Sequence, residues 1–250
     1  MLGGNASSEI RMWVCGARGE NMLETGLVEE LMLENLYRNP DKNYSVWDGI
    51  MYEMARSEPN IELLLNCSVN ECEMENGRIA SVTGWQMTTQ TFHIVEAALF
   101  ADCSGDSVLA PLSGALFRYG RESAGEFGED IAPAEADRKT MGMSCLIQAR
   151  EEPRPSVFIP PKGAYRFTKE DLPYRIPNMD DPYENFWYME LGGEDDAIAD
   201  TERVRDELLK VAYGVWDYVK NAPENREKNK NWPSELSGTA LDKDLRRNTG

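Results

Sequence analysis

The sequence predicts a mixed α/β fold in which helices accompany a β-meander. Residues 61–101 contain three strand-like runs, and Asn76-Gly77 between the first two is a strong signal for a tight hairpin. Apolar residues with helical spacing occur before this meander and again from Thr201 onwards. The 250 residues are enough for one large domain or two modest ones, each with a real core.

Two helices are expected before the meander. Thr25 is positioned to cap the first, because Asn, Asp, Ser and Thr side chains accept hydrogen bonds from free N–H groups at a helix start. Ser45, with Asp48 three residues on, is expected to begin the second helix, which Pro59 ends. The residues expected to face inward are Leu27, Val28, Leu31 and Met32 in the first helix, and Val46, Trp47, Ile50, Met51 and Met54 in the second.

The third strand of the meander leads into Ser104-Gly105-Asp106. Polar alternation disappears along residues 92–101, which predicts a strand that becomes buried on both faces. Ser-Gly-Asp then favours a tight turn before a short helix. Such a turn is typical of sites for phosphates or sugar hydroxyls, but the residues of the turn alone favour the simpler interpretation, in which Asp106 is a helix N-cap.

The second half of the chain has a different composition. Residues 121–191 are rich in charged residues, prolines and aromatic residues, which predicts long loops. Thr201 begins the clearest helix, whose apolar stripe predicts a core element. The polar residues from about 221 to 250 are expected to be poorly fixed.

Composition limits the classes of partner. A formal net charge of −18 argues against nucleic-acid binding, which depends on clustered Lys and Arg. No apolar run is long enough to span a membrane, and no signal peptide is visible, so we expect a soluble, cytoplasmic protein. His93 is the single histidine, and its alternation with apolar neighbours favours a structural role. With one histidine, the chain has a single imidazole ligand for a zinc site and a single candidate for the histidine of a catalytic triad, which argues against both.

Five cysteines at irregular spacing predict reduced, mostly buried thiols. Cys67 and Cys72 have the C-x-x-x-x-C spacing of disulfide reductases, in which the pair lies at a helix start. Here both fall in a predicted strand, which would separate their Cα atoms by about 16 Å. A disulfide needs less than about 7 Å, so we expect both thiols to stay unbonded.

Several segments in order resemble the FAD-dependent oxidoreductases of the glutathione-reductase-like flavoprotein class. They are "LGGNASSEIRMW", "ETGLVEELMLENLYRN", "FADCSGDSVLAPLSGALFRYGRE", "FGEDIAPAEADRKTMGMSCLIQARE" and "FWYMELGG". The resemblance implies a Rossmann-like FAD domain interrupted by a substrate domain. It assigns residues 1–118 to a partial FAD-binding domain and residues 119–250 to a substrate or cap domain.

The opening G-x-G-x-x-G unit of that family has no counterpart here, so the resemblance also implies a chain truncated at both ends. We therefore expect the chain alone to bind FAD weakly or not at all. Carried over residue by residue, the resemblance implies a cofactor site with three parts. The proposed cofactor-binding residues are Gly3, Gly4, Asn5, Ala6, Ser7 and Ser8 beside the pyrophosphate and flavin, Val69 beside adenine, and Ser104, Gly105 and Asp106 closing over the dinucleotide.

Catalytic residues are harder to assign, because a flavin supplies the redox chemistry and side chains need only orient the substrate and move a proton. A guanidinium suits a substrate carboxylate or hydroxyl, which makes arginines the candidates. Arg11 and Arg121 are the main candidates, followed by Arg118 and Arg138. The resemblance implies a small-molecule substrate. A non-catalytic remnant that binds carbohydrate or protein through its aromatic loops remains the alternative.

Overall fold

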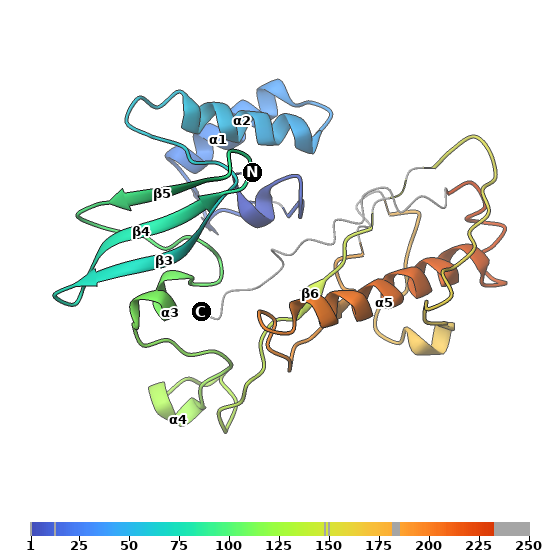
Figure 1. Cartoon of the computed structure of the whole chain (residues 1–250). Coiled ribbons are helices and arrows are strands. Elements are labelled where there is room, and N and C mark those ends of the chain that lie inside the picture. Colours follow the sequence, from blue (N-terminus) through green and yellow to red (C-terminus); the bar gives the residue numbers. More distant parts are fainter. Residues whose placement is uncertain (1, 13, 148, 150, 182–185, 233–250) are drawn as a thin grey trace. The chain divides into compact units, whose positions relative to one another are not determined.

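A computed structural model describes the chain at residues 2–12, 14–147, 149, 151–181 and 186–232 (Figure 1). The chain divides into two compact units, Met1–Arg118 and Tyr119–Gly250. Helices and small antiparallel sheets occur together, which confirms the mixed α/β class. The assignment of the two units to a cofactor domain and an inserted substrate domain stays a prediction.

The elements of the first unit are the 3-10 helix η1 (Gly4–Ala6), β1 (Arg18–Gly19), β2 (Met22–Leu23), α1 (Leu27–Arg38), α2 (Tyr44–Arg56), β3 (Cys67–Glu75), β4 (Arg78–Gln86), β5 (Thr91–Glu96) and α3 (Leu109–Ser113). Those of the second unit are α4 (Ala124–Phe127), β6 (Met143–Ser144), the 3-10 helix η2 (Lys169–Asp171), β7 (Glu190–Leu191) and α5 (Thr201–Asn221). No helix among the described residues is both long and apolar enough to cross a membrane.

Both expected helices of the first unit form, but with different caps. Gly26, and not Thr25, is the N-cap of α1, and no side chain caps that end. The N-cap of α2 is Asn43, whose side-chain oxygen accepts hydrogen bonds from the N–H groups of Ser45 and Val46. The capping prediction for Ser45 was therefore wrong by two residues, because Asn43 is the last extended residue and reaches the same free donors.

Helix α2 carries the small core of the first unit, whereas α1 contributes nothing fully buried. Trp47, Ile50 and Met51 are buried, as the sequence predicted. In α1 the expected inward residues are at most half-buried, and Leu27 and Leu36 are largely exposed. The spacing of the apolar residues predicted the helix correctly. Spacing alone does not say whether another element covers the apolar face of that helix.

The meander forms as predicted, with strand order β3-β4-β5 and antiparallel pairing throughout. Asn76 and Gly77 have φ values of 50° and 74°, the left-handed conformation that a two-residue hairpin turn requires. Trp85 on β4 lies opposite Phe92 on β5, with ring centroids 4.7 Å apart. His93 Nε2 donates a hydrogen bond to Gln86 Oε1 of the neighbouring strand at 3.0 Å, as a structural residue would.

The end of the meander differs from the prediction. Strand β5 stops at Glu96, and residues 97–103 are irregular. Phe92 and Ile94 are exposed, and Leu99 is 90% exposed. Strand β5 pairs only with β4 and is an edge strand, so the expectation of burial on both faces was wrong for the described residues of this chain.

In the second unit, helix α5 is the centre of the core, as its apolar stripe predicted. Trp216 is fully buried and its ring packs edge-on against Phe186, with centroids 6.0 Å apart. The short strands β6 and β7 pair with each other and pack against α5. Gly214 allows the backbone of Tyr165 to pass close to the helix, since a Cβ there would stand 2.5 Å from the Tyr165 carbonyl oxygen.

Residues 222–232 are well anchored, contrary to the expectation of a poorly fixed tail from about 221. Lys220 is 3% exposed, and its ammonium group donates to the carbonyl oxygens of Asn229, Lys230 and Trp232 and to Ser156 Oγ. The buried lysine thus ties the chain after α5 back onto the helix. Residues 233–250 lie outside the described residues.

All five cysteines are unbonded. Cys67 and Cys72 both lie on β3, which confirms the predicted strand and the predicted free thiols. The expectation of mostly buried thiols was wrong, because only Cys145 is buried while Cys15 and Cys103 are exposed. Burial raises the pKa of the Cys145 thiol to about 12.

Candidate functional site

The Ser104-Gly105-Asp106 turn is organised by a residue that precedes it, Asp102. One oxygen of the Asp102 carboxylate accepts the N–H of Ser104 at 2.9 Å, and the other accepts the N–H of Leu109 at 2.8 Å. Ser104 Oγ accepts the N–H of Val108 at 3.1 Å. Two side chains therefore accept hydrogen bonds from the N–H groups of Val108 and Leu109 at the start of α3, and the N-cap of this helix is Val108 and not Asp106.

Hydrogen bonding keeps Asp102 ionised. Partial burial is the largest single influence and by itself would raise the pKa of this carboxyl group. The hydrogen bonds from Ser104 and from the Leu109 N–H together outweigh it, so the pKa of Asp102 lies below its ordinary value. A permanent carboxylate at this position holds the turn in one conformation at neutral pH.

Gly105 gives the turn its shape. Its φ is +94°, a conformation that residues with a side chain rarely adopt. Apart from Gly105 and its two chain neighbours, no atom of the described residues lies within 4 Å of the position that a Cβ would take. The backbone conformation therefore requires the glycine, and crowding does not. The backbone at the top of this turn is therefore open to an approaching molecule.

A cavity of about 240 Å³ lies between the sheet and the turn. Its walls are mainly apolar, and its polar groups come from Asp102 and Ser104, in and just after the irregular segment that follows β5. The lining residues are Val69, Val82, Phe100, Ala101, Asp102, Cys103, Ser104, Val108 and Leu109. Flat apolar walls beside a few polar groups suit a planar ring with polar substituents.

The Gly3–Ser8 loop is held on helix α2. The indole N–H of Trp47 donates to the Ala6 carbonyl oxygen at 2.7 Å, and the N–H of Ser8 donates to the Asp48 carboxylate at 2.8 Å. Ser7 is buried. Gly3 and Gly4 both have positive φ. Beyond the chain neighbours of Gly4, no atom in the described part of the chain lies within 4 Å of a Cβ position on it. The loop is thus fixed at its back, and its backbone is open at Gly4.

The structure brings together only some of the residues that the sequence singled out. Val69 and Ser104 line the same cavity, whereas Gly105 and Asp106 lie in the turn beside it and the Gly3–Ser8 loop does not line it. Sequence reasoning missed Asp102, which both lines the cavity and positions the turn. The signal for it was an acidic residue directly before a turn and seven residues before Leu109, within reach of the first free helix donors.

Two of the four candidate arginines are engaged in local structure. Arg11 has a φ of 62°, and its Nε donates to the Ser8 carbonyl oxygen at 2.9 Å, so it belongs to the Gly3–Ser8 loop. Arg121 forms a forked ion pair with Asp137, and the two residues also pair through their backbones. The hydrogen bonds from Arg121 and from the Lys139 N–H lower the pKa of Asp137 to about 2.

The other two candidate arginines, Arg118 and Arg138, also have interaction partners within the structure. Arg138 lies over the ring of Tyr119, with its guanidinium carbon 4.7 Å from the ring centroid. Arg118 has a polar or charged partner already. Arg11 lies beside a proposed cofactor segment, because its Nε donates to the Ser8 carbonyl oxygen.

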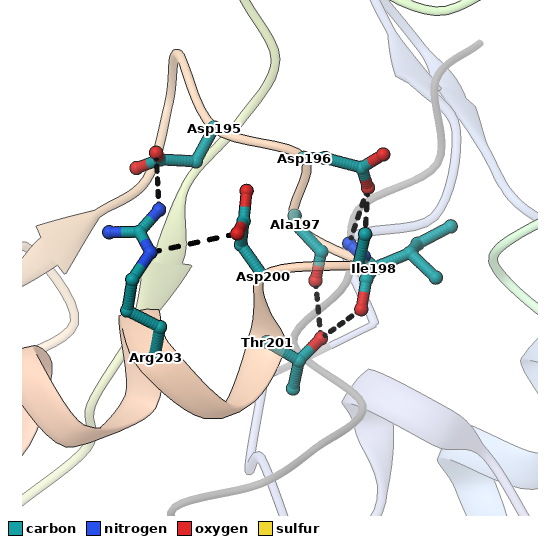
Figure 2. A network of polar contacts seen from close by, with 8 residues as sticks. Asp195, Asp196, Ala197, Ile198, Asp200, Thr201 and Arg203 are labelled. Carbon is teal, nitrogen blue, oxygen red and sulfur yellow. Dashed lines mark hydrogen bonds and ion pairs between the residues drawn. The ribbon is translucent and has the colours of Figure 1, made fainter.

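Several aspartates lie directly before helix α5, where they form ion pairs and accept hydrogen bonds from backbone N–H groups (Figure 2). Arg203 pairs with Asp195 at 2.6 Å and lies 3.6 Å from Asp200. Asp196 accepts the N–H groups of Ile198 and Ala199, at 3.0 and 2.9 Å. Within the described ranges no group of His, Cys, Asp and Glu side chains is arranged to hold a metal ion.

Comparison with known families gives one match. The family model for FAD dependent oxidoreductases matches residues 1–240. No curated protein and no solved structure matches the chain.

Proposed function

Because the chain belongs to the FAD-dependent oxidoreductase family, we propose that it takes part in hydride transfer between FAD and a small organic substrate. The family match over residues 1–240 is the observation that carries this proposal. FAD is the cofactor of the family, and when bound it supplies the redox chemistry through its isoalloxazine ring. The glutathione-reductase-like subclass and the division into an FAD domain, 1–118, and a substrate domain, 119–250, are part of the same proposal.

The cavity beside the strand end fits one part of FAD. Its volume of about 240 Å³ is below the roughly 300–1,000 Å³ of sites that enclose a whole drug-sized ligand. The apolar walls from Val69, Val82 and Leu109 suit a flat ring, and Val69 is the position that the family resemblance assigns to adenine. We therefore propose that this cavity takes the adenine ring while the rest of the cofactor leaves it over the turn.

The turn would contribute backbone contacts. Asp102 fixes Ser104 and the start of α3, while the open backbone at Gly105 would allow a phosphate or ribityl hydroxyl to approach. Asp106 follows directly and would accept hydrogen bonds from cofactor hydroxyls. In this proposal Asp102 acts through the turn and Ser104, Gly105 and Asp106 meet the ligand.

The Gly3–Ser8 loop would serve the flavin side. Asp48 and Trp47 hold its backbone from behind, so the loop needs little further ordering when a ligand binds. Its open position at Gly4 permits close backbone contact. Arg11, anchored on the Ser8 carbonyl oxygen, is proposed to orient a substrate hydroxyl, and the ion-paired Arg121 is less available.

An FAD titration with two matched variants tests this proposal. Val69→Phe adds a ring inside the cavity, whereas Val95→Phe adds the same ring on β5, at a residue that does not line it. We expect Val69→Phe to weaken FAD binding and Val95→Phe to leave it unchanged, with thermal unfolding confirming that both variants fold. Because the chain alone is expected to bind FAD weakly, the titration extends to high FAD concentrations, and equal affinities for the two variants would contradict the placement of the cofactor.

A further inference from the structure

Arg175 lies in a corner formed by two aromatic rings of the second unit. Its guanidinium carbon is 5.2 Å from the ring centroid of Trp187 and 4.8 Å from that of Tyr188. The two ring centroids are 6.3 Å apart, and the ring planes meet at 77°. Both rings therefore contact the same cation from nearly perpendicular directions, which restricts where the guanidinium can go.

The corner is built on the core. Phe186, directly before the two rings, is buried against Trp216 of α5, and Met189, directly after them, is buried as well. The N–H of Met189 donates to the Phe186 carbonyl oxygen at 3.0 Å, which closes a turn around Trp187 and Tyr188. The rings are thus held by buried neighbours on both sides, so the position of Arg175 is largely set before any ligand arrives.

Arg175 has no carboxylate partner among the residues that the structure describes. This is notable in a chain with 44 acidic and 26 basic residues, in which Arg121, Arg203 and Arg205 all pair with carboxylates. Because the two rings are nearly perpendicular, only one of them can stack on a face of the planar guanidinium, and the other meets its edge. The N–H groups that are directed away from both rings have no hydrogen-bond partner among the described residues. A pre-positioned cation with free, forked donors is suited to a carboxylate.

We propose that Arg175, Trp187 and Tyr188 form a recognition site for a small organic carboxylate with a flat apolar body. Trp187 is 39% exposed and offers that body a contact surface beside the cation. A single guanidinium neutralises a monoanion, whereas a phosphate dianion would keep a negative charge beside a protein of net charge −18. This inference rests on the proposed oxidoreductase function, for which it names a substrate class.

The test uses benzoate as the probe, with calorimetric titration of the full chain. We expect benzoate to bind the wild type and to bind Arg175→Ala about tenfold more weakly or not at all. Trp187→Leu should also weaken binding, and Arg175→Lys should restore only part of it because an ammonium lacks the planar fork. Arg166→Ala removes another exposed arginine of the same unit and should bind as the wild type does.

Three further measurements distinguish a failure of the proposed carboxylate site from a failure of the proposed oxidoreductase function. Benzyl alcohol, which lacks the charge, should not compete with benzoate, and inorganic phosphate should bind much more weakly. FAD titration of the Arg175 and Trp187 variants should match the wild type, because neither residue belongs to the proposed cofactor site. FAD binding that does not respond to Val69→Phe would argue against the proposed function and not against this site. Benzoate binding that is absent in the wild type, equal in Arg175→Ala, or matched by phosphate would overturn the inference.

Discussion

The carboxylate of Asp48 in helix α2 accepts a hydrogen bond from the backbone N–H of Ser8 at 2.8 Å, across 40 residues of sequence. This contact joins the proposed flavin loop to the helix that carries the buried residues Trp47, Ile50 and Met51. The sequence had suggested Asp48 as part of a helix cap, yet the structure uses it to hold a loop far away in the chain. Its removal should therefore affect the loop more than the helix.

Asp48→Ala should lower the free energy of unfolding by about 1–2 kcal/mol, because it leaves a partly buried backbone donor without its acceptor. Urea unfolding at pH 7 measures this loss. Asp41→Ala changes an exposed acid two residues before the cap of α2 and should stay within about 0.5 kcal/mol of the wild type. Equal losses in the two variants would show that the Ser8 contact adds nothing.

Asp102→Asn should reduce stability in a pH-dependent way. The pKa of Asp102 is lowered in the folded protein, so its contribution is present above the ordinary carboxyl pKa of about 4 and is lost as the pH falls through the lower folded value. The stability difference between wild type and variant should therefore be largest near neutral pH and shrink in acid. Urea unfolding across this range measures it, and a difference that stays constant would contradict the role of the charged carboxylate.

Lys220→Met should destabilise the second unit by about 2–5 kcal/mol, because it leaves the carbonyl oxygens of Asn229, Lys230 and Trp232 without their buried donor. Limited proteolysis should then cut between residues 222 and 232. Lys228→Met, at an exposed ion pair with Asp180, should cost no more than about 1 kcal/mol. Unchanged protease resistance in Lys220→Met would show that other contacts hold this segment.

Thiol labelling should distinguish the cysteines. Cys15 and Cys103 are exposed and should react readily in the native protein, whereas the raised pKa of about 12 and the burial of Cys145 should protect it. In denaturant without a reductant all five cysteines should react, since Cys67 and Cys72 are unbonded. Mass spectrometry of the labelled peptides checks both points, and a native Cys145 that reacts as fast as Cys15 would contradict the packing around β6.

Asp137 should titrate with a pKa of about 2, because the Arg121 guanidinium and the Lys139 N–H stabilise its carboxylate. Its contribution to stability is thus expected to persist to low pH and to be lost as the pH falls through about 2. In Arg121→Gln the pKa should rise toward the ordinary value of about 3.9. Side-chain NMR titration measures both, and the same low pKa in the variant would mean that the ion pair is not its cause.

The features that the sequence predicted well are those set by neighbours in the chain. The apolar stripe of α5 follows from spacing within one helix, and the hairpin at Asn76-Gly77 follows from two residues that tolerate positive φ. The unbonded state of Cys67 and Cys72 follows from their shared strand. In each case the deciding physical constraint acts within a few residues.

The candidate site was predictable only in part. The turn at Ser104-Gly105-Asp106 could be found from its composition, but its anchor, Asp102, could be identified only once the path of the chain placed the Leu109 N–H beside that carboxylate. The same holds for the N-cap of α2, where the sequence offered Ser45 and the backbone conformation selected Asn43. Caps compete for the same donors, and local geometry decides between them.

The sequence by itself therefore determined the mixed α/β class, the meander, the core helix α5 and the resemblance to flavin-dependent oxidoreductases, since these depend on periodicity, turn chemistry and residue order. Only the tertiary structure decided that Asp48 holds Ser8, that Lys220 is buried among carbonyl groups and that Arg175 meets Trp187 and Tyr188. Each of these contacts joins residues that are distant in the chain, or selects one partner among many similar ones. Their formation depends on which segments pack together, and local patterns carry no information about that choice.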